Sequence, residues 1–251
     1  MEFISHCSNP LIVDTIVDTL VGNFYDAAMV ITRRDSTRKR TAAPLLPVLR
    51  ERIARRELPP GTKLLENDLA LEFGVSRAKV RDAFGVLEQR GLIQRIPNRG
   101  AVVARLDLSQ VFEIYAVREM LEGLCVRLAV ERSKPQSWQD LAELFGRPMD
   151  LIVKRGEFEK YIGNLDKLRS RTLAAAGNGV LADMLDSIND KTRDIQRRII
   201  ILPGRAAEGL EQHRAVLAAM RKGDANKAEE LRRANIRSSR EYLERYQSFV
   251  L

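Results

Sequence analysis

The feature that constrains the fold most strongly is a helical periodicity that continues almost without interruption from Ser109 to the end of the chain. In the segment SQVFEIYAVREMLEGLCVRLAVERS, apolar residues recur three or four positions apart, which is the spacing of one face of an amphipathic helix. The residues of this apolar stripe are Val111, Ile114, Val117, Leu121, Leu124 and Leu128. We therefore expect residues 107–251 to form an all-helical bundle of six or seven helices. After the first helix, the same spacing predicts helices at 136–145, 148–156, 158–175, 178–199, 206–222 and 224–247.

Residues 41–106 have a mixed pattern that predicts three helices followed by a small β-hairpin. The first helix ends at the Pro-Pro-Gly segment 59–61, because proline cannot continue a helix and glycine permits a turn. The second helix ends at Gly74, and Ser76 is a suitable N-cap for a third helix that ends at Gly91. The segment LIQRIPNRGAVVARL then alternates in hydrophobicity around a tight turn. This order is typical of a winged helix-turn-helix, so the whole chain is expected to be mainly α.

The positive charge of the chain is concentrated in one segment. Between Arg33 and Arg105 there are 17 Lys and Arg against eight Asp and Glu, a net charge of +9, whereas the rest of the chain amounts to −1. Such a segment indicates a polyanionic partner. The alternative is ordinary solubilising charge.

The third helix of the mixed region has the residues expected of a helix whose N-terminal end reads base edges in the major groove of DNA. Arg77 and Arg81 are four positions apart and share one face. Arginine matches the two acceptors of guanine, and Ser76 can cap the helix and donate its hydroxyl to a phosphate. The alternative is that these are ordinary surface charges. The predicted DNA-binding residues, including those of the hairpin turn, are Ser76, Arg77, Lys79, Arg81, Asn98, Arg99 and Gly100.

Residues 1–40 form an N-terminal extension. The first 28 residues contain no Lys or Arg, which argues against a secretory signal peptide. Three interpretations stay open: a short helix, a flexible arm, or a mis-called start, in which case Met29 would be a natural beginning. The basic tract 33–43 is either a solvated tail or an arm that contacts DNA phosphates.

Residues that build disulfides and metal centres are scarce. Cys7 and Cys125 form no CxxC motif, and the only histidines are His6 and His213. This usage argues against a disulfide framework and a multi-histidine metal centre, and it fits the reducing cytoplasm. No apolar run reaches the length of a transmembrane helix. No phosphate loop, HExxH motif or nucleophile–base arrangement indicates an enzyme.

The segment PPGTKLLENDLALEFGVSRAKVRDAFGVLEQRGLIQRIPNRGAVVARL closely resembles the winged-helix domain of GntR-family transcriptional regulators. The following helices resemble the FCD effector domain of the FadR-like branch, in VREMLEGLCVRLAVERS, LAAAGNGVL and EQHRAVLAAMRKGDANKAEELRRANI. The resemblance covers roughly residues 40–247 and implies a homodimer that binds a DNA operator under the control of a small organic acid. The matching winged-helix positions are Pro60, Gly61, Leu64, Glu66, Leu69, Ala70, Gly74, Val75, Ser76, Arg77, Val80, Arg81, Ala83, Leu87, Gly91, Leu92, Pro97, Asn98 and Gly100.

Two positions depart from the family's DNA-reading pattern. Asn67 stands where some members have an arginine, which puts one phosphate or base contact in doubt. Ala78 and Lys79 replace the Thr-Pro that often separates the two recognition arginines, and this replacement adds a charge.

The effector domain departs from its pattern at the metal. Many FCD domains hold a divalent metal with one aspartate and three histidines. The aspartate position falls at or beside Asp166, and the histidine positions fall at Arg169 or Ser170, at His213 and at Asn235. Because arginine cannot coordinate a metal and one histidine is left, we predict no bound metal and no cofactor.

We expect Arg169 to bind a carboxylate effector directly in place of the metal. The alternatives are that Arg169 pairs with Asp166 or faces water, and that His213 is only a polar helix residue. The predicted effector-binding residues are Arg118, Asp166, Arg169, Arg197, His213 and Asn235.

Together these features predict a cytoplasmic, sequence-specific transcriptional regulator, a homodimeric repressor that binds double-stranded DNA under the control of a small carboxylate, with no membrane partner. The alternative is an architectural or effector-independent DNA-binding protein, which would show little sequence preference. An enzyme with a helical catalytic domain is the third hypothesis, and no catalytic motif supports it.

Overall fold

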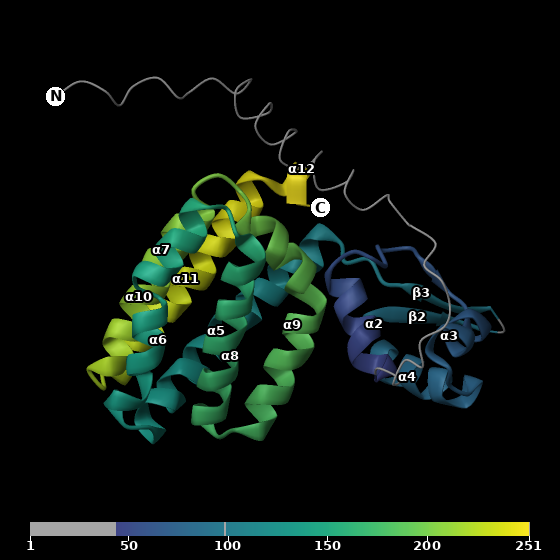
Figure 1. Ribbon diagram of the computed structural model, residues 1–251, viewed down its shortest axis with the longest axis horizontal. Helices are drawn as coiled ribbons and strands as arrows, with labels where there is room; N and C mark the ends of the chain where they lie inside the picture. The colour runs from purple at the N-terminus through teal and green to yellow at the C-terminus, as the bar shows by residue number, and fades with distance from the viewer. Residues whose placement is uncertain (1–43, 98, 251) are drawn as a thin grey trace, which may run out of the picture. The chain divides into compact units, whose positions relative to one another are not determined.

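The computed structural model describes residues 44–97 and 99–250 (Figure 1). The N-terminal extension, the basic tract 33–43 and Asn98 of the predicted DNA-binding set lie outside the described residues. Within the described ranges, no helix combines the length and the hydrophobicity needed to cross a membrane.

Residues 45–103 form a winged helix-turn-helix, as predicted. The helices are α2 (Leu45–Ala54), α3 (Glu66–Phe73) and α4 (Arg77–Gln89). The predicted hairpin corresponds to β2 (Ile93–Ile96) and β3 (Gly100–Val103), which pair in an antiparallel register. A short strand that was not predicted, β1 (Lys63–Leu64), pairs with the other edge of β3, so the sheet order is β1-β3-β2. Two residues are too few to show an alternation that sequence patterns can detect.

One hydrophobic core joins these helices to the sheet. Val80, Phe84 and Leu87 lie on one face of α4, and each is at most 1% exposed. They belong to one cluster with Leu49 of α2 and Ile93 of β2. This packing fixes which face of α4 is buried and leaves the opposite, basic face in solvent.

Gly100, which the sequence predicts to be part of the DNA-binding turn, has a structural requirement of its own. Its φ is +89°, and a Cβ at this position would lie 2.3 Å from the carbonyl oxygen of Leu64 in β1. An alanine would therefore need a left-handed backbone and would also push β1 away from β3.

We expect Gly100→Ala to destabilise the winged domain by about 1–3 kcal/mol, the cost of one residue held in a strained backbone conformation. Urea unfolding of the full chain measures this change. Gly163→Ala in α8 (Phe158–Ala176) is the control, because a Cβ there meets nothing within 4 Å. The control should be neutral or slightly more stable than the parent, since alanine is the better helix former. Equal stability of the Gly100 variant and the parent would contradict the prediction.

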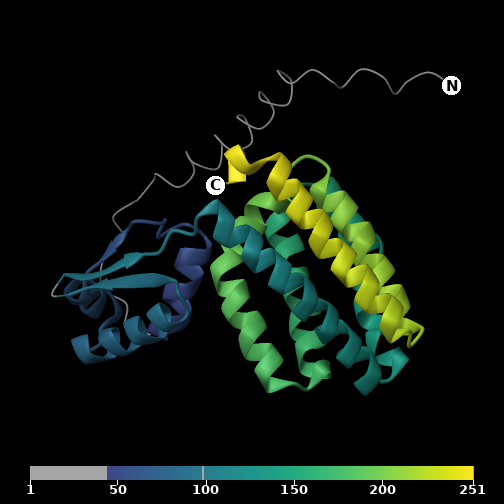
Figure 2. The same cartoon turned by 180° about the vertical axis from the view of Figure 1, so that it is seen from behind.

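Residues 108–250 form the predicted all-helical domain (Figure 2), and each of the seven expected helices has a counterpart. A 3-10 turn, η1 (Pro135–Trp138), precedes the second of them, and α12 (Gln247–Val250) adds a last turn. Side chains of Asp107, Asn178 and Asp224 cap three of the helices by accepting backbone hydrogen bonds. In addition to α8, the helices are α5 (Leu108–Arg132), α6 (Gln139–Leu144), α7 (Arg147–Lys154), α9 (Gly179–Ile200), α10 (Arg205–Arg221) and α11 (Ala225–Arg245).

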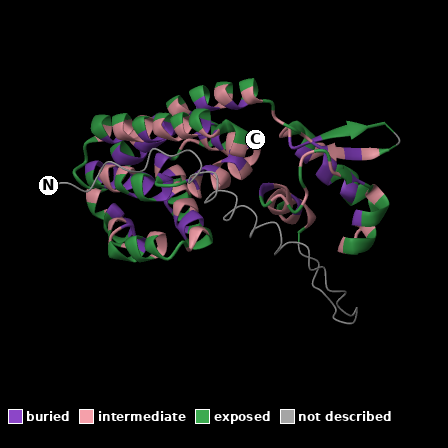
Figure 3. Ribbon diagram, turned by 90° about the horizontal axis from the view of Figure 1, so that it is seen from above, coloured by how far each residue is buried: buried purple, intermediate pink, exposed green. Residues whose placement is uncertain are grey.

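The helices of this domain turn buried faces toward one another and exposed faces outward (Figure 3). Helix α5 is central and packs against α8, α9 and α11. Trp138, Phe145 and Tyr161, each at most 2% exposed, are the largest side chains of the main core. Because several helices surround α5, polar residues on it can be buried and still find partners.

The buried face of α5 differs from the expected one. Val117 and Leu124, which the sequence places in the apolar stripe, are 53% and 39% exposed, and Met120 is 52% exposed. Arg118 and Glu122 are buried instead, each at 8% exposure. Apolar spacing identifies a helix, but it cannot rank two faces when partners on other helices neutralise buried charges.

Candidate functional site

The turn between α3 and α4 presents the predicted DNA-reading helix. Gly74 ends α3 in the left-handed conformation, with φ +64°. Ser76 is extended, and its hydroxyl oxygen accepts a hydrogen bond from the backbone N–H of Lys79 at 3.3 Å. The expected N-cap therefore forms, and it starts α4 at Arg77.

The basic side chains at the start of α4 are exposed, but they are not equivalent. Arg81 Nε donates to Glu66 of α3 at 2.7 Å, and its backbone carbonyl accepts a hydrogen bond from Arg95. Arg77 and Lys79 form no ion pair with any described residue. Arg77 and Lys79 are thus free to contact an anion, whereas Arg81 is held against α3 by Glu66, a partner that sequence reasoning missed.

The wing is only partly described. Arg99 is exposed, and its backbone N–H donates to the carbonyl of Ile96 at 3.0 Å, which closes the tight turn. Asn67, which differs from the arginine that some family members have at this position, is exposed in the first turn of α3, beside Glu66. A side chain at position 67 therefore reaches solvent near the reading helix.

A second candidate site is a cavity of about 110 Å³ inside the helical domain, between α5, α8, α9, α10 and α11. On the same measure one water needs about 10–15 Å³, so this cavity has room for a small molecule. Leu168, Ile199 and Met220 contribute to its apolar wall. The polar lining residues are Arg118, Glu122, Asp166, Arg169, Thr172, Asn189, Gln196, Arg205, His213, Arg232, Asn235 and Ser239.

Five of the six predicted effector-binding residues line this cavity: Arg118, Asp166, Arg169, His213 and Asn235. The sixth, Arg197, is not among the lining residues, and its guanidinium pairs with Glu159 instead. Arg169 lines the cavity and pairs at 2.7 Å with Asp186, not with Asp166. Sequence reasoning missed Glu122, Gln196, Arg205 and Arg232.

Glu122 is the centre of a buried charge cluster. Its carboxylate accepts hydrogen bonds from Arg118 Nε at 3.3 Å and from Arg232 Nη2 at 2.8 Å. Burial alone would raise the pKa of the Glu122 carboxyl, but the charges of Arg232 and Arg118 and the Arg232 hydrogen bond lower it to about 2. The signal in the sequence was the spacing of four residues between Arg118 and Glu122, which places them on one face of α5.

Amide side chains extend this cluster along the cavity wall. Arg232 Nη1 donates to Asn235 Oδ1 at 2.9 Å, and Asn235 Nδ2 donates to Gln212 Oε1 at 2.7 Å. Gln212 Oε1 also accepts from Arg205 Nη1 at 3.2 Å. Asn235 therefore positions two other polar side chains in this structure.

His213 is 7% exposed, and its Nδ1 is buried without a hydrogen-bond partner among the described residues. Burial, together with the charges of Arg232 and Arg205, holds the pKa of His213 well below its usual value. The imidazole is therefore neutral at pH 7. The edge of the Phe145 ring lies against it, with ring centroids 5.8 Å apart.

The side chains present do not fit the divalent metal that the sequence resemblance implies. Asp166 accepts from Arg193 at 3.3 Å and is 44% exposed, and Arg169 occupies a position where a histidine is expected. No group of three or more His, Cys, Asp and Glu able to hold a metal occurs among the described residues. Three guanidinium groups, those of Arg232, Arg205 and Arg118, act on the remaining imidazole of His213 against the one carboxylate of Glu122, so the surroundings repel a cation.

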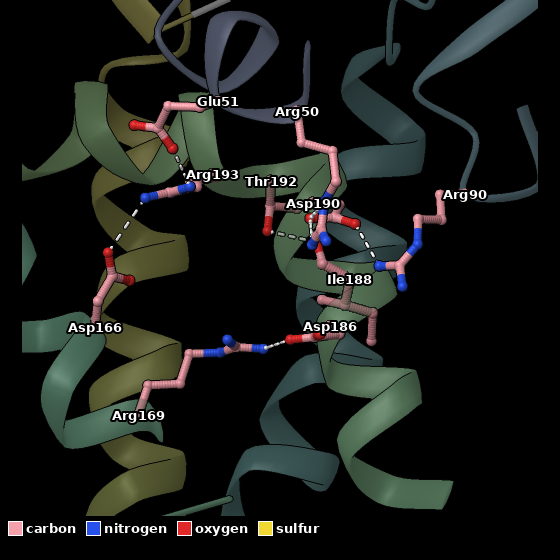
Figure 4. A network of polar contacts seen from close by, with 10 residues as sticks. All are labelled: Arg50, Glu51, Arg90, Asp166, Arg169, Asp186, Ile188, Asp190, Thr192 and Arg193. Carbon is pink, nitrogen blue, oxygen red and sulfur yellow. Dashed lines mark hydrogen bonds and ion pairs between the residues drawn. The ribbon is translucent and has the colours of Figure 1, made fainter. Parts of the chain in front are cut away.

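Side chains of α9 form polar contacts with the winged domain (Figure 4), and other residues of the same helix line the cavity. Asp190, whose side chain is 6% exposed, accepts from Arg50 of α2 and from Arg90, which follows α4, the second at 2.6 Å. Arg193 pairs with Glu51 of α2 on one side and with Asp166 of α8 on the other. One face of α9 thus lines the cavity while neighbouring residues hold α2 and the end of α4.

Two family models match the chain, one over each region. Residues 47–103 match the model described as bacterial regulatory proteins, gntR family. Residues 113–238 match the model of the FCD domain. These matches confirm the resemblance to GntR-family regulators and to the FCD domain, and the assignment to the FadR-like branch stays a prediction.

Individual relatives agree with the family matches. An uncharacterized HTH-type transcriptional regulator in an unstable DNA locus of Streptomyces ambofaciens is 28% identical over 205 residues, covering 78% of this chain and 82% of that protein. The HTH-type transcriptional repressor RspR of Escherichia coli K12 is 25% identical over 185 residues, covering 72% and 79% respectively. The matched families and relatives are transcriptional regulators, not enzymes.

Among solved structures, E. coli McbR/YncC has the same fold. Its TM-score is 0.69 at 22% sequence identity, over 81% of this chain and 96% of that one.

Proposed function

Because this chain belongs to the GntR family of bacterial regulatory proteins and carries an FCD domain, we propose that it is a homodimeric transcriptional repressor whose affinity for a DNA operator is controlled by a small organic acid. With DNA as its target, the protein would act in the cytoplasm. The observation that carries the proposal is the basic start of α4, where Arg77 and Lys79 are exposed and make no ion pair with any described residue.

DNA reading by α4 follows from the geometry of a helix-turn-helix. The helix enters the major groove with its N-terminal residues toward the base edges, and these residues here are Arg77, Lys79 and Arg81. The exposed Arg99 of the wing is placed to contact the backbone or the minor groove. Arg81 must exchange its contact with Glu66 for one with DNA, or hold α3 and α4 together while Arg77 reads the base.

The exposed stripe of α5 supports a homodimer. Val117, Met120 and Leu124 are three or four positions apart, and they share one exposed face of a helix otherwise surrounded by other helices. A second copy of the chain would cover this apolar face. The two reading helices of the dimer would then be related by a two-fold axis. Two half-sites of a pseudo-palindromic operator require that arrangement.

The cavity supports an acidic effector, because arginine side chains from several helices line it. Control of DNA binding would follow from α9, which lines the cavity through Asn189 and Gln196 and holds the winged domain through Asp190. An effector that changes the position of α9 changes the relative stability of DNA-competent and DNA-incompetent arrangements.

Fluorescence anisotropy with DNA from the region upstream of the protein's own gene, at two salt concentrations, tests this function. We expect tight binding to this DNA, weaker binding to a nonspecific duplex, and an affinity that falls with salt because phosphate contacts release counterions. Equal and steeply salt-dependent binding to both duplexes would favour an architectural DNA-binding protein instead. An absence of binding to genomic operator fragments would contradict the assigned role of α4.

A further inference from the structure

We propose, resting on the effector role proposed above, that the cavity binds a dianion such as a dicarboxylate, recognised without a metal ion by Arg205 and by the Arg118–Arg232 pair. The side chains that line this cavity do not fit the metal that the family pattern implies. The unshared positive charge of the cavity comes from guanidinium groups on α5, α10 and α11.

Arg205 is a buried cation that forms no ion pair with any described residue. It is 6% exposed, lines the cavity, and donates to one neutral acceptor, Gln212 Oε1. It is also the first residue of α10, where the free backbone N–H groups add positive potential. Glu208, one turn along α10, compensates this charge only through space and forms no ion pair with it. A buried charge without a paired partner is costly, so an anion bound beside Arg205 would be stabilised electrostatically.

Neighbouring residues hold the Arg205 guanidinium in place. It lies over the ring of Tyr242, 5.4 Å from the centroid. A Cβ on Gly209 would lie 3.1 Å from Arg205 Nη1 and 3.2 Å from the hydroxyl oxygen of Tyr161. Because Gly209 has no side chain, the Arg205 guanidinium fits beside it on α10. Arg205 is therefore held in position and does not turn freely into solvent.

Counting charges around the cavity leaves two positive charges in excess. Arg118 and Arg232 share the single carboxylate of Glu122, so that cluster carries one net positive charge. Arg205 carries the second, since the nearby Glu208 forms no ion pair with it and accepts hydrogen bonds from Gln212, Ser238 and Tyr242 instead. Arg169 and Asp166 add no net charge, because Asp186 pairs with Arg169 at 2.7 Å and Arg193 pairs with Asp166 at 3.3 Å.

The two positive centres are separate but connected. Gln212 and Asn235 bridge Arg205 to Arg232 through hydrogen bonds of 3.2, 2.7 and 2.9 Å. The neutral His213, with its unpartnered Nδ1, also lines this wall and offers a hydrogen bond to a ligand oxygen. A ligand with two carboxylates satisfies both centres, whereas a monocarboxylate satisfies one.

Isothermal titration calorimetry on the full chain after dialysis against EDTA tests the proposal, with succinate and its matched monoacid butyrate as probes. We expect succinate to bind more tightly than butyrate by roughly tenfold to a hundredfold, the range for one hydrogen bond to a charged group. In Arg205→Met, succinate should bind no better than butyrate. Arg171→Gln, an exposed α8 side chain that pairs with Asp140, should leave both affinities unchanged.

Several results would overturn the proposal. These are equal affinity for the two probes, an unchanged succinate affinity in Arg205→Met, or binding that returns only after Zn²⁺ is added. If no dicarboxylate from malonate to adipate binds, the dianion inference is wrong, while operator binding by anisotropy still decides the regulatory function. Circular dichroism and thermal unfolding of Arg205→Met check whether the variant folds. We expect it to fold, because methionine fills a similar volume and removes a buried charge.

Discussion

Arg77→Ala is expected to remove sequence-selective DNA binding while the fold stays intact. Arg77 is exposed at the first position of α4 and pairs with no described residue, so its loss leaves no partner unsatisfied. A good arginine–guanine contact discriminates by about 1–3 kcal/mol, and a dimer loses it in both half-sites. The expected loss of affinity for the operator is therefore about 30-fold to 10⁴-fold, at the rate of tenfold per 1.4 kcal/mol.

Anisotropy titrations with operator and nonspecific duplexes at one salt concentration measure this change. The ratio of the two affinities should collapse in Arg77→Ala. Lys79→Ala should instead weaken binding to both duplexes alike and reduce the salt slope by about one phosphate contact per subunit. Arg155→Ala, an exposed residue at the end of α7, is the control and should change neither affinity. A retained affinity ratio in Arg77→Ala would show that another element reads the bases.

Glu122→Gln is expected to cause the largest loss of stability. The substitution removes the one carboxylate shared by Arg118 and Arg232 and leaves two guanidinium groups together in a buried site. Removing one partner of a buried ion pair costs about 3–5 kcal/mol. In a domain of this size each kcal/mol corresponds to about 2–4 °C in Tm, so a decrease of about 6–20 °C is expected at pH 7.

The stability lost in Glu122→Gln is expected to depend on pH. The folded-state pKa of Glu122 is lowered from 4.5 to about 2, so its contribution is complete above pH 4.5 and is lost as the pH falls toward 2. The stability difference between the parent and Glu122→Gln should therefore shrink across that interval. Thermal unfolding at several pH values measures it.

Glu131→Gln is the matched control for this prediction, because Glu131 pairs with Arg127 at the surface, where both side chains are more than 40% exposed. Such a pair contributes about 0–1 kcal/mol, so the control should unfold close to the parent. If Glu122→Gln unfolds within about 0.5 kcal/mol of the parent, as ordinary surface substitutions do, the cluster does not stabilise the domain.

Much of the fold was predictable because its signals are local. Gly74, Ser76 and the apolar face of α4 determine where the third helix begins and which side it buries, and the structure has them as expected. The strand β1 was missed, since two residues acquire their conformation only by pairing with β3. The buried face of α5 was misjudged, because Arg118 is buried only where helices distant in sequence supply its partners.

The residues of the candidate cavity, like the fold, could be predicted only in part from the sequence. Asp166, His213 and Asn235 were assigned from the family's metal positions, and all three line one cavity. Arg197 was assigned to the same cavity, but its position on α9 pairs it with Glu159. A charge pattern cannot distinguish a cavity-lining arginine from an outward one without the angle at which each helix packs.

The sequence by itself determined the order of the elements and the basic reading helix, since each of these depends on which residues stand within a few positions of one another. Only the tertiary structure decided the charges of the cavity. Glu122 and Arg232 are 110 positions apart, and Arg118 and Gln196 are 78 positions apart. Electrostatic compensation depends on distance in space, so the net charge of the cavity exists only after the helices have packed.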